Sequence, residues 1–292
     1  MKSIFTIAFL ATIVFVNTGC KKDEPTNTAP TATEAPLTLH IDTEFNGDVI
    51  EEGGEYTAGT TKFRLDALAF YINSVEIIKS DNTVIRLPDN QAFYVKLTEG
   101  SGGGGHSHKT QHGDHSYAEI SLGNVPKGSY KGIRFSIGHP MMTGHNGSGG
   151  TVGKVQPTDF ADTHALSAKT PSMWWAWASG YIFFRADGVV DTNNNGVIDS
   201  TGTTSLADRS MTVHLGTSDM IQTITSFENR AFTVGDGNNE LALHFDFSGF
   251  FNDINLREEY VTHSLGNGAA LARRYRNNLN SVFYVPVLTA KQ

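Results

Sequence analysis

The sequence predicts an all-β protein: a single antiparallel β-sandwich or barrel-like domain with long loops and one or two short C-terminal helices. Three observations lead to this fold class. Apolar and polar residues alternate with a period of two through most of the chain, as in strands with one buried face. Clusters of Gly, Asn and Asp separate these runs, as turns do between antiparallel strands. Only residues 253–279 have helical spacing, with a break at residues 266–268.

Residues 1–19 form a targeting segment rather than part of the fold. Lys2 precedes the apolar run IFTIAFLATIVFV, and Gly19 precedes Cys20, the one cysteine of the chain. This order is typical of a secretory signal, and the run is too short for a membrane span. A cysteine at this place indicates a lipobox, so we expect Cys20 to be acylated and to tether the protein to a bacterial envelope membrane, facing the periplasm or the outside. The alternative is cleavage that leaves a free thiol.

The next segment, residues 20–36, is expected to be a disordered linker, because its Pro, Thr, Ala and charged residues cannot bury a core. Residues 37–287 then form the β domain. Removing residues 1–19 removes Lys2 and no acidic residue, which changes the net charge from −8 to −9. An acidic domain repels phosphate backbones, so nucleic acid is not an expected partner.

Nine alternating runs are expected to be strands. They are residues 37–45, 63–78, 92–97, 117–122, 130–138, 181–186, 211–216, 230–234 and 240–247. Two insertions interrupt this pattern, a Gly/His-rich segment at residues 99–116 and a polar loop at residues 191–203.

Three strand histidines are candidate metal ligands. His40, His214 and His244 each alternate with aliphatic residues, so their side chains point away from the aliphatic face. They are ordinary surface histidines unless two or more converge under a covering loop. Neutral imidazole is a good ligand for copper and zinc.

The loop between residues 138 and 173 carries further soft ligands. It contains His139, His145 and His164, with Met141 and Met142 beside the first two. Thioethers next to imidazoles favour Cu(I), although methionine also fills gaps in cores.

The Gly/His-rich insertion has the composition of a metal-binding tract. Its flexible backbone favours a loose chelator at the entrance of a site, or an incidental surface loop, over a catalytic centre. Its histidines are His106, His108, His112 and His115.

The polar insertion DTNNNGVID follows the first nine positions of a calcium loop, with oxygen side chains at Asp191, Asn193, Asn195 and Asp199. Position twelve is Gly202, so the bidentate Glu of such loops is missing. Asn-Asn-Gly is also a common hairpin turn. A weak calcium site and a plain turn both stay open.

No motif of hydrolytic chemistry is present. The sequence contains no Gly-rich phosphate loop, no GxSxG and no HExxH. We therefore expect a binding protein and not an enzyme.

All three tryptophans stand within four positions, at Trp174, Trp175 and Trp177. The core M-x-W-x-W-x-x-G-Y, here from Met173 to Tyr181, and the later strand MTVHLG resemble the MbnP-type envelope proteins. The likeness extends over most of residues 37–247, including the segments LTLHID, RLDALAFYINSVEI and VPKGSYKGIRFSIG. The lone cysteine is a departure, since several family members carry disulfides.

The resemblance implies a periplasmic, β-rich copper-binding protein in which an oxidised tryptophan, kynurenine, holds Cu(I) beside histidines. A MauG-type dihaem enzyme and an outer-membrane transporter are the implied partners. Indole offers no nitrogen lone pair to a metal, whereas kynurenine has an aniline nitrogen. Without the resemblance, Trp175 and Trp177 would be assigned to core packing.

The resemblance implies a set of metal ligands, and some of them match the family pattern better than others. Trp175 or Trp177 is the oxidisable ligand, and His214 matches best. His40 lies in the matching first strand, and His145 or His164 completes the site.

We therefore expect an envelope lipoprotein that binds copper for uptake, storage or delivery. The chief alternative is a carbohydrate-binding surface module with a Trp platform and a calcium loop. A zinc-dependent enzyme ranks last, because no general base stands beside the histidines.

Overall fold

The computed structural model describes residues 33–88, 91–96, 116–143, 155–169, 173–175, 180–199 and 208–284. These residues form two curled β-sheets and a single α-helix, α1 (Ala269–Val282). No helix in these residues combines the length and the apolar character that a membrane crossing requires. The predicted all-β class is confirmed.

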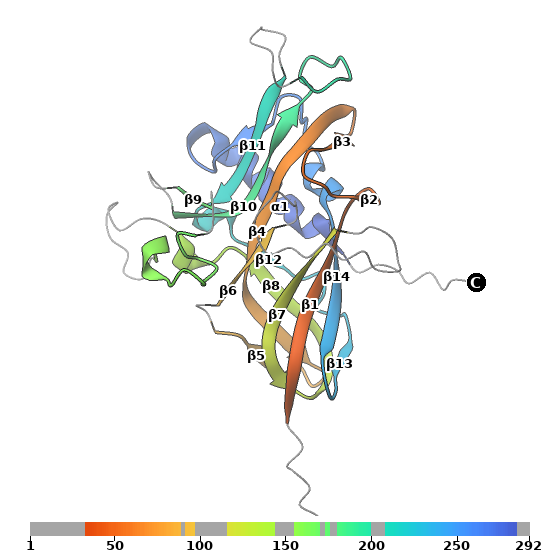
Figure 1. Ribbon diagram of the computed structural model, residues 1–292, viewed down its shortest axis with the longest axis vertical. Coiled ribbons are helices and arrows are strands. Elements are labelled where there is room, and N and C mark those ends of the chain that lie inside the picture. Colours follow the sequence, from red (N-terminus) through yellow and green to blue (C-terminus); the bar gives the residue numbers. More distant parts are fainter. Residues whose placement is uncertain are drawn as a thin grey trace, which may run out of the picture. The chain divides into compact units, whose positions relative to one another are not determined.

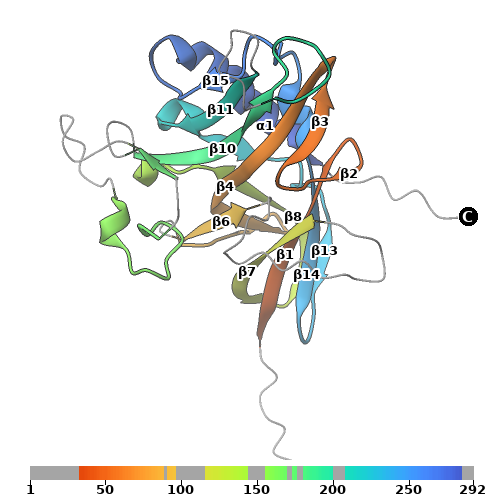
Figure 2. The same ribbon diagram turned by 45° about the horizontal axis from the view of Figure 1, so that its top comes forward.

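The small sheet has five strands, with the path β16-β14-β1-β2, and β7 also pairs with β1, on the edge opposite β14. Figure 1 and Figure 2 both show β1, β7 and β14 side by side. β1 pairs antiparallel with β7 but parallel with β14. The strands are β1 (Glu34–Phe45), β2 (Asp48–Val49), β7 (Ser116–Pro126), β14 (Asn239–Asp246) and β16 (Phe283–Tyr284).

The large sheet has eleven strands, with a path β12-β8-β4-β10-β11-β15 and five short strands attached to it. The long strand β4 (Thr61–Lys79) pairs with both β8 and β10 and so joins the two halves of this sheet. The path strands are β8 (Gly128–Ile137), β10 (Gly180–Val190), β11 (Arg209–Gly216), β12 (Gln222–Ile224) and β15 (Val261–Thr262). The attached strands are β3 (Gly54–Ala58), β5 (Val84–Arg86), β6 (Ala92–Lys96), β9 (Trp174–Trp175) and β13 (Phe232–Val234).

The core lies between the two sheets. Alternation in β1 buries Leu37, Leu39 and Ile41 completely, as the sequence predicts. Phe70 of the large sheet stacks on Phe245 of the small sheet, with ring centroids 5.5 Å apart. Burial of such aromatic side chains is the main source of stability in a fold of this kind.

The C-terminal region differs in part from the prediction. Residues 269–282 form α1, but residues 253–265 form turns and the short strand β15 instead of a helix. β15 pairs parallel with β11, opposite Thr212 and Val213. In a short segment, apolar residues at helical spacing do not distinguish a helix from a turn that buries the same residues. The short 3-10 helices are η1 (Pro140–Met142), η2 (Pro157–Asp159), η3 (Ser218–Met220), η4 (Phe247–Phe251) and η5 (Gly266–Gly268).

All nine predicted strand runs contain a strand. The first strand begins at Glu34 rather than at Leu37, and residues 285–287 lie outside the described residues.

Candidate metal centre

Trp175 is held at the edge of the large sheet. The two residues of β9 pair with the start of β10, Trp175 opposite Gly180 and Trp174 opposite Tyr181. The Trp175 side chain is 5% exposed. Its ring lies on Gly216 of β11, where an added Cβ would come within 2.6 Å of the ring atom Cζ3. The absence of a side chain at Gly216 therefore makes room for the indole.

Two histidines meet beside this indole. β15 runs parallel to β11 with Thr262 opposite Val213, so the next register position places His263 opposite His214. The two imidazole centroids are 5.2 Å apart with nearly perpendicular planes. The Trp175 ring is 6.3 Å from each of them.

Ser264 fixes this arrangement through the backbone. Its hydroxyl donates to the carbonyl oxygen of His214 at 2.8 Å and accepts from the amide of Gly216 at 3.1 Å. The residue after His263 is thus fastened to both ends of the HLG segment. This contact keeps the two histidine side chains adjacent.

A carboxylate orients the His214 ring. Nε2 of His214 lies 2.8 Å from Oδ1 of Asp187, whose other oxygen accepts from Nε of Arg185 at 2.6 Å. Burial raises the pKa of Asp187, but the hydrogen bond and charge of His214, together with Arg185, outweigh burial and leave this pKa below its usual value. The carboxylate is therefore ionised and accepts a hydrogen bond from the Nε2–H group of His214.

The other nitrogen of His214 is left for a ligand. With Nε2 hydrogen-bonded to Asp187, Nδ1 is buried and has no hydrogen-bond partner among the residues that the structure describes. A buried polar atom without a partner calls for an explanation such as an ion. A carboxylate on the far ring nitrogen is also the usual support of a metal-bound histidine.

His263 is suited to the same role. Burial and the neighbouring His214 both lower its pKa, against an opposing effect of Asp187. A histidine with a lowered pKa stays neutral, and only the neutral ring can bind a metal. His263 was not among the predicted ligands, although HSLG at residues 263–266 repeats the His, Leu and Gly of HLG at residues 214–216 with one serine inserted.

His40 lies elsewhere. It stands in β1 at the middle of the small sheet, with Nε2 3.0 Å from Asp42 and Nδ1 3.9 Å from both Glu119 and Glu240. In the described part of the chain, one group of three His, Cys, Asp or Glu side chains has its ligand atoms within 4.8 Å of one another. Its members are His40, Glu119 and Glu240. The side chains of Glu119 and Glu240 are more than half exposed, and carboxylates suit harder ions than Cu(I).

The structure does not bring His40 and His214 together. They belong to different sheets, and each lies on the side of its strand opposite the core residues. The expectation that both bind one ion therefore has no geometric support, because the sequence pattern gives the face of a strand but not which sheet the strand joins. His244 shares the small sheet with His40 and lies 3.5 Å from Asp42.

Of the remaining predicted ligands, His164 lies in the described part of the chain and several others lie outside it. His164 stacks on Phe160 with centroids 4.2 Å apart, and its Nδ1 accepts from the amide of Leu166 at 3.1 Å. Its loop is joined to the tryptophan region because the hydroxyl of Tyr181 donates to Leu166 at 2.6 Å. Outside the described residues lie Cys20, His106, His108, His112, His115, His145 and Trp177.

The predicted calcium loop connects β10 and β11. Both oxygens of Asp191 accept backbone amides, from Asn195 at 3.1 Å and Gly196 at 2.8 Å. Asn193 and Asn195 each accept an amide two residues later. Asp199 lies at the end of this turn, and its amide donates to Asp208 at 2.7 Å.

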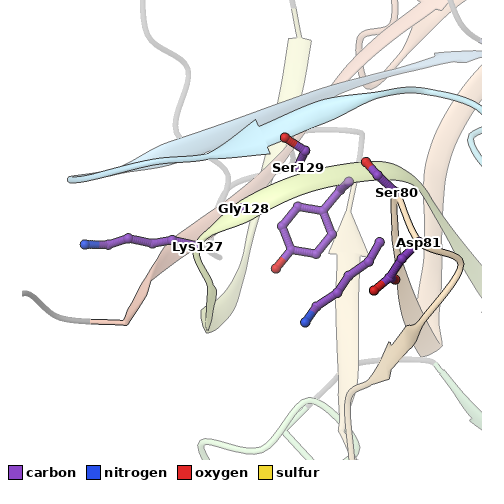
Figure 3. A pocket seen from close by; sticks show the side chains of 7 residues that line it. Ser80, Asp81, Lys127, Gly128 and Ser129 are labelled. Atoms are coloured by element: carbon purple, nitrogen blue, oxygen red, sulfur yellow. The ribbon is translucent and has the colours of Figure 1, made fainter.

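A small pocket of about 230 Å³ lies away from these groups. Figure 3 shows Ser80 and Asp81 on one side and the segment from Lys127 to Ser129 on the other. Lys127 is ion-paired with Asp236. None of the predicted site residues lines this pocket, so we assign it no part in metal binding.

A comparison with protein-family models shows to which family this chain belongs. The MbnP family model matches residues 34–265. The chain belongs to the MbnP family. This family is associated with copper, and the match covers every element of the Trp175, His214 and His263 group.

A solved structure agrees at the level of the fold. MbnP from Methylosinus trichosporium superimposes with a TM-score of 0.50 at 16% sequence identity, over 76% of this chain and 78% of that one. No curated protein matches the sequence. The MbnP fold is therefore shared, and the residues of the site have to be argued from this chain.

Proposed function

We propose that this MbnP-family protein binds copper as Cu(I) in the group formed by Trp175, His214 and His263, for uptake, storage or delivery rather than for turnover. His214 offers Nδ1 and His263 offers its neutral ring. Imidazole suits copper, and two imidazoles beside a buried indole favour a low coordination number. This assignment replaces His40 with His263 in the expected ligand set.

The observation that carries the proposal is the buried Nδ1 of His214. Among the described residues this atom has no hydrogen-bond partner, and Asp187 holds the opposite nitrogen. The buried Nδ1 of His40 has no hydrogen-bond partner there either, but only His214 has a second histidine, His263, beside it. A histidine that served only packing or the surface would gain stability by satisfying that atom. A metal ion satisfies it directly.

Trp175 has two roles under this proposal. As an intact indole it covers the histidines and excludes water, since it is 5% exposed. Oxidised to kynurenine, it supplies an aniline nitrogen as a further ligand. We assign the oxidation to a MauG-type dihaem enzyme and prefer Trp175 to Trp177 because Trp175 contacts both histidines.

The proposal places the protein in the cell envelope. A lipid on Cys20 anchors it there, and an outer-membrane transporter is the partner that exchanges copper with it. The sugar-platform alternative is disfavoured at Trp175, because a ring that is 5% exposed has no face free for stacking.

The test is copper retention after loading and dialysis against a weak chelator. Residues 99–116 are deleted from all proteins so that their histidines do not contribute. His214→Ala and His263→Ala are each expected to lose the bound copper, whereas His244→Ala, a matched strand histidine of the small sheet, keeps it. The mass of the peptide that contains Trp174 and Trp175, from native-host protein, reports whether kynurenine is present.

Two outcomes would contradict the assignment. Stoichiometric copper in His214→Ala and in His263→Ala would remove both histidines from the site. Loss of copper in His244→Ala alone would move the site to the small sheet. Circular dichroism of each variant separates a lost ligand from a lost fold.

A further inference from the structure

Two buried aspartates face each other at the loop end of the β10–β11 hairpin. Val190 pairs with Arg209, so the next register position sets Asp191 opposite Asp208. Asp191 is 3% exposed and Asp208 is 8% exposed. Like charges directly opposite on a sheet destabilise it, and burial makes the repulsion stronger.

The basic side chains that touch this loop do not neutralise the pair. Lys62 donates to the carbonyl of Gly196 at 3.2 Å and forms its ion pair with Glu55 at 2.6 Å. Arg257 donates to the side chain of Asn194. Within the described part of the chain, neither base forms an ion pair with Asp191 or Asp208.

Asp208 points independently to a missing cation. Its Oδ2 accepts the amide of Asp199 at 2.7 Å, which fixes the carboxylate against the loop. Its Oδ1 is buried and has no hydrogen-bond partner among the described residues. A buried carboxylate oxygen without a donor costs free energy that a bound cation recovers.

The loop sequence specifies which cation. Asp191, Asn193, Asn195 and Asp199 stand at positions one, three, five and nine of a calcium loop, with Gly196 at position six. The loop lacks the acid at position twelve, where Gly202 stands. The hairpin register supplies a replacement from the other strand.

We propose that Asp208 completes a Ca²⁺ site with Asp191, Asn193, Asn195, Asp199 and the backbone carbonyl of Val197. The acid that a calcium loop takes from its twelfth residue comes here from the start of β11. Ca²⁺ neutralises the facing aspartates and fastens the two ends of the loop. The ligand oxygens of Asp191, Asp199 and Asp208 are not all within 4.8 Å of one another, so Ca²⁺ binding brings these three side chains closer together.

This site is separate from copper binding. It uses oxygen ligands only, which Cu(I) does not prefer. None of its residues belongs to the group of Trp175, His214 and His263. Failure of one proposal therefore leaves the other standing.

The test is calcium titration of the full-length protein after removal of metals with EDTA, followed by calorimetry and by thermal unfolding. We expect a dissociation constant on the order of 10⁻⁴ to 10⁻³ M, the range of extracellular calcium modules, and a higher Tm in Ca²⁺ than in EDTA. Mg²⁺ at the same concentration is expected to raise Tm less, because it requires a tighter octahedral site.

Three variants make the test specific. Asp208→Asn keeps the acceptor for Asp199 but removes the charge, and is expected to weaken Ca²⁺ binding by about tenfold or more. Asp236→Asn, the same change at an aspartate whose side chain is 85% exposed between β13 and β14, is expected to leave Ca²⁺ binding unchanged. Asn195→Asp adds a carboxylate at position five and is expected to tighten binding.

The proposal is overturned if the wild-type protein shows the same Tm in Ca²⁺ and in EDTA. It is also overturned if Asp208→Asn binds Ca²⁺ like the wild type, or if Mg²⁺ and Ca²⁺ act equally. Asn195→Asp keeps the test decisive if Asp208→Asn unfolds, since a plain turn would only lose stability from the added charge.

Discussion

At the scale of single residues, the surroundings of a histidine decide what it can do. His40, His214 and His244 have the same alternating neighbours in the sequence. Only His214 combines a carboxylate on one ring nitrogen, a buried and unpartnered second nitrogen, and an adjacent histidine. His40 also has a carboxylate on one ring nitrogen and, among the described residues, a buried second nitrogen without a hydrogen-bond partner, but its other neighbours are the carboxylates of Glu119 and Glu240 rather than a histidine.

Gly216 is the residue-scale test of the indole pocket. Gly216→Ala is expected to destabilise the protein by about 1–3 kcal/mol and to weaken copper binding, because its Cβ would lie 2.6 Å from both Trp175 and the carbonyl of Tyr181. Urea unfolding and copper titration measure the two effects. Gly235→Ala, where nothing lies within 4 Å, is the matched control, and equal effects in both variants would contradict the role of the pocket.

At the scale of elements, the outer face of the small sheet is acidic. Adjacent strands β14, β1 and β7 set Glu240, His40 and Glu119 close to one another, and Asp42 accepts from the His40 ring at 3.0 Å. The hydrogen bond to Asp42 raises the pKa of His40, against the opposing effect of burial, and the charges of Asp42, Glu240 and Glu119 act in the same direction as the hydrogen bond. Protonated His40 thus offsets repulsion among the carboxylates.

The raised pKa of His40 makes the stability of the folded protein depend on pH. Because the pKa of His40 is higher in the folded protein than 6.5, its stabilising effect is complete below pH 6.5 and is lost as the pH rises through the raised value. The His40→Gln variant is expected to lose less stability than the wild type as the pH rises. Urea midpoints over a pH series on both sides of 6.5, compared with His244→Gln, measure it. An unchanged profile in His40→Gln would show that His40 does not carry the effect.

At the scale of the whole domain, α1 closes one end of the core. Its buried residues are Ala272, Tyr275, Leu279 and Val282. Tyr275 packs on Phe250 with centroids 4.7 Å apart, and its hydroxyl donates to the carbonyl of Glu259 at 2.7 Å. The helix therefore supports the segment that leads into β15 and His263.

Leu279 tests this support. Leu279→Ala is expected to cost about 2–5 kcal/mol of the free energy of unfolding, because it leaves a cavity at a fully buried position. Asn280→Ala, its exposed neighbour on the same helix, is expected to change stability by less than about 0.5 kcal/mol. Thermal and urea unfolding compare them, and similar costs would mean that the helix does not close the core.

Much of this protein was determined by its sequence alone. Period-two alternation located the nine predicted strands, because a half-buried strand must alternate. The Trp-rich core with HLG indicated the family, and the residues from Asp191 to Asp199 indicated either a weak calcium loop or a plain turn. Each of these predictions depends on residues that are close together in the sequence.

Only the tertiary structure decided which distant residues meet. The register of β15 on β11 placed His263 beside His214, and the register of β10 on β11 placed Asp208 opposite Asp191. The assignment of β1 and β11 to different sheets separated His40 from His214. Alternation fixes the face on which a side chain lies, but strand pairing across the chain fixes its neighbours, and pairing depends on the packing of the whole core.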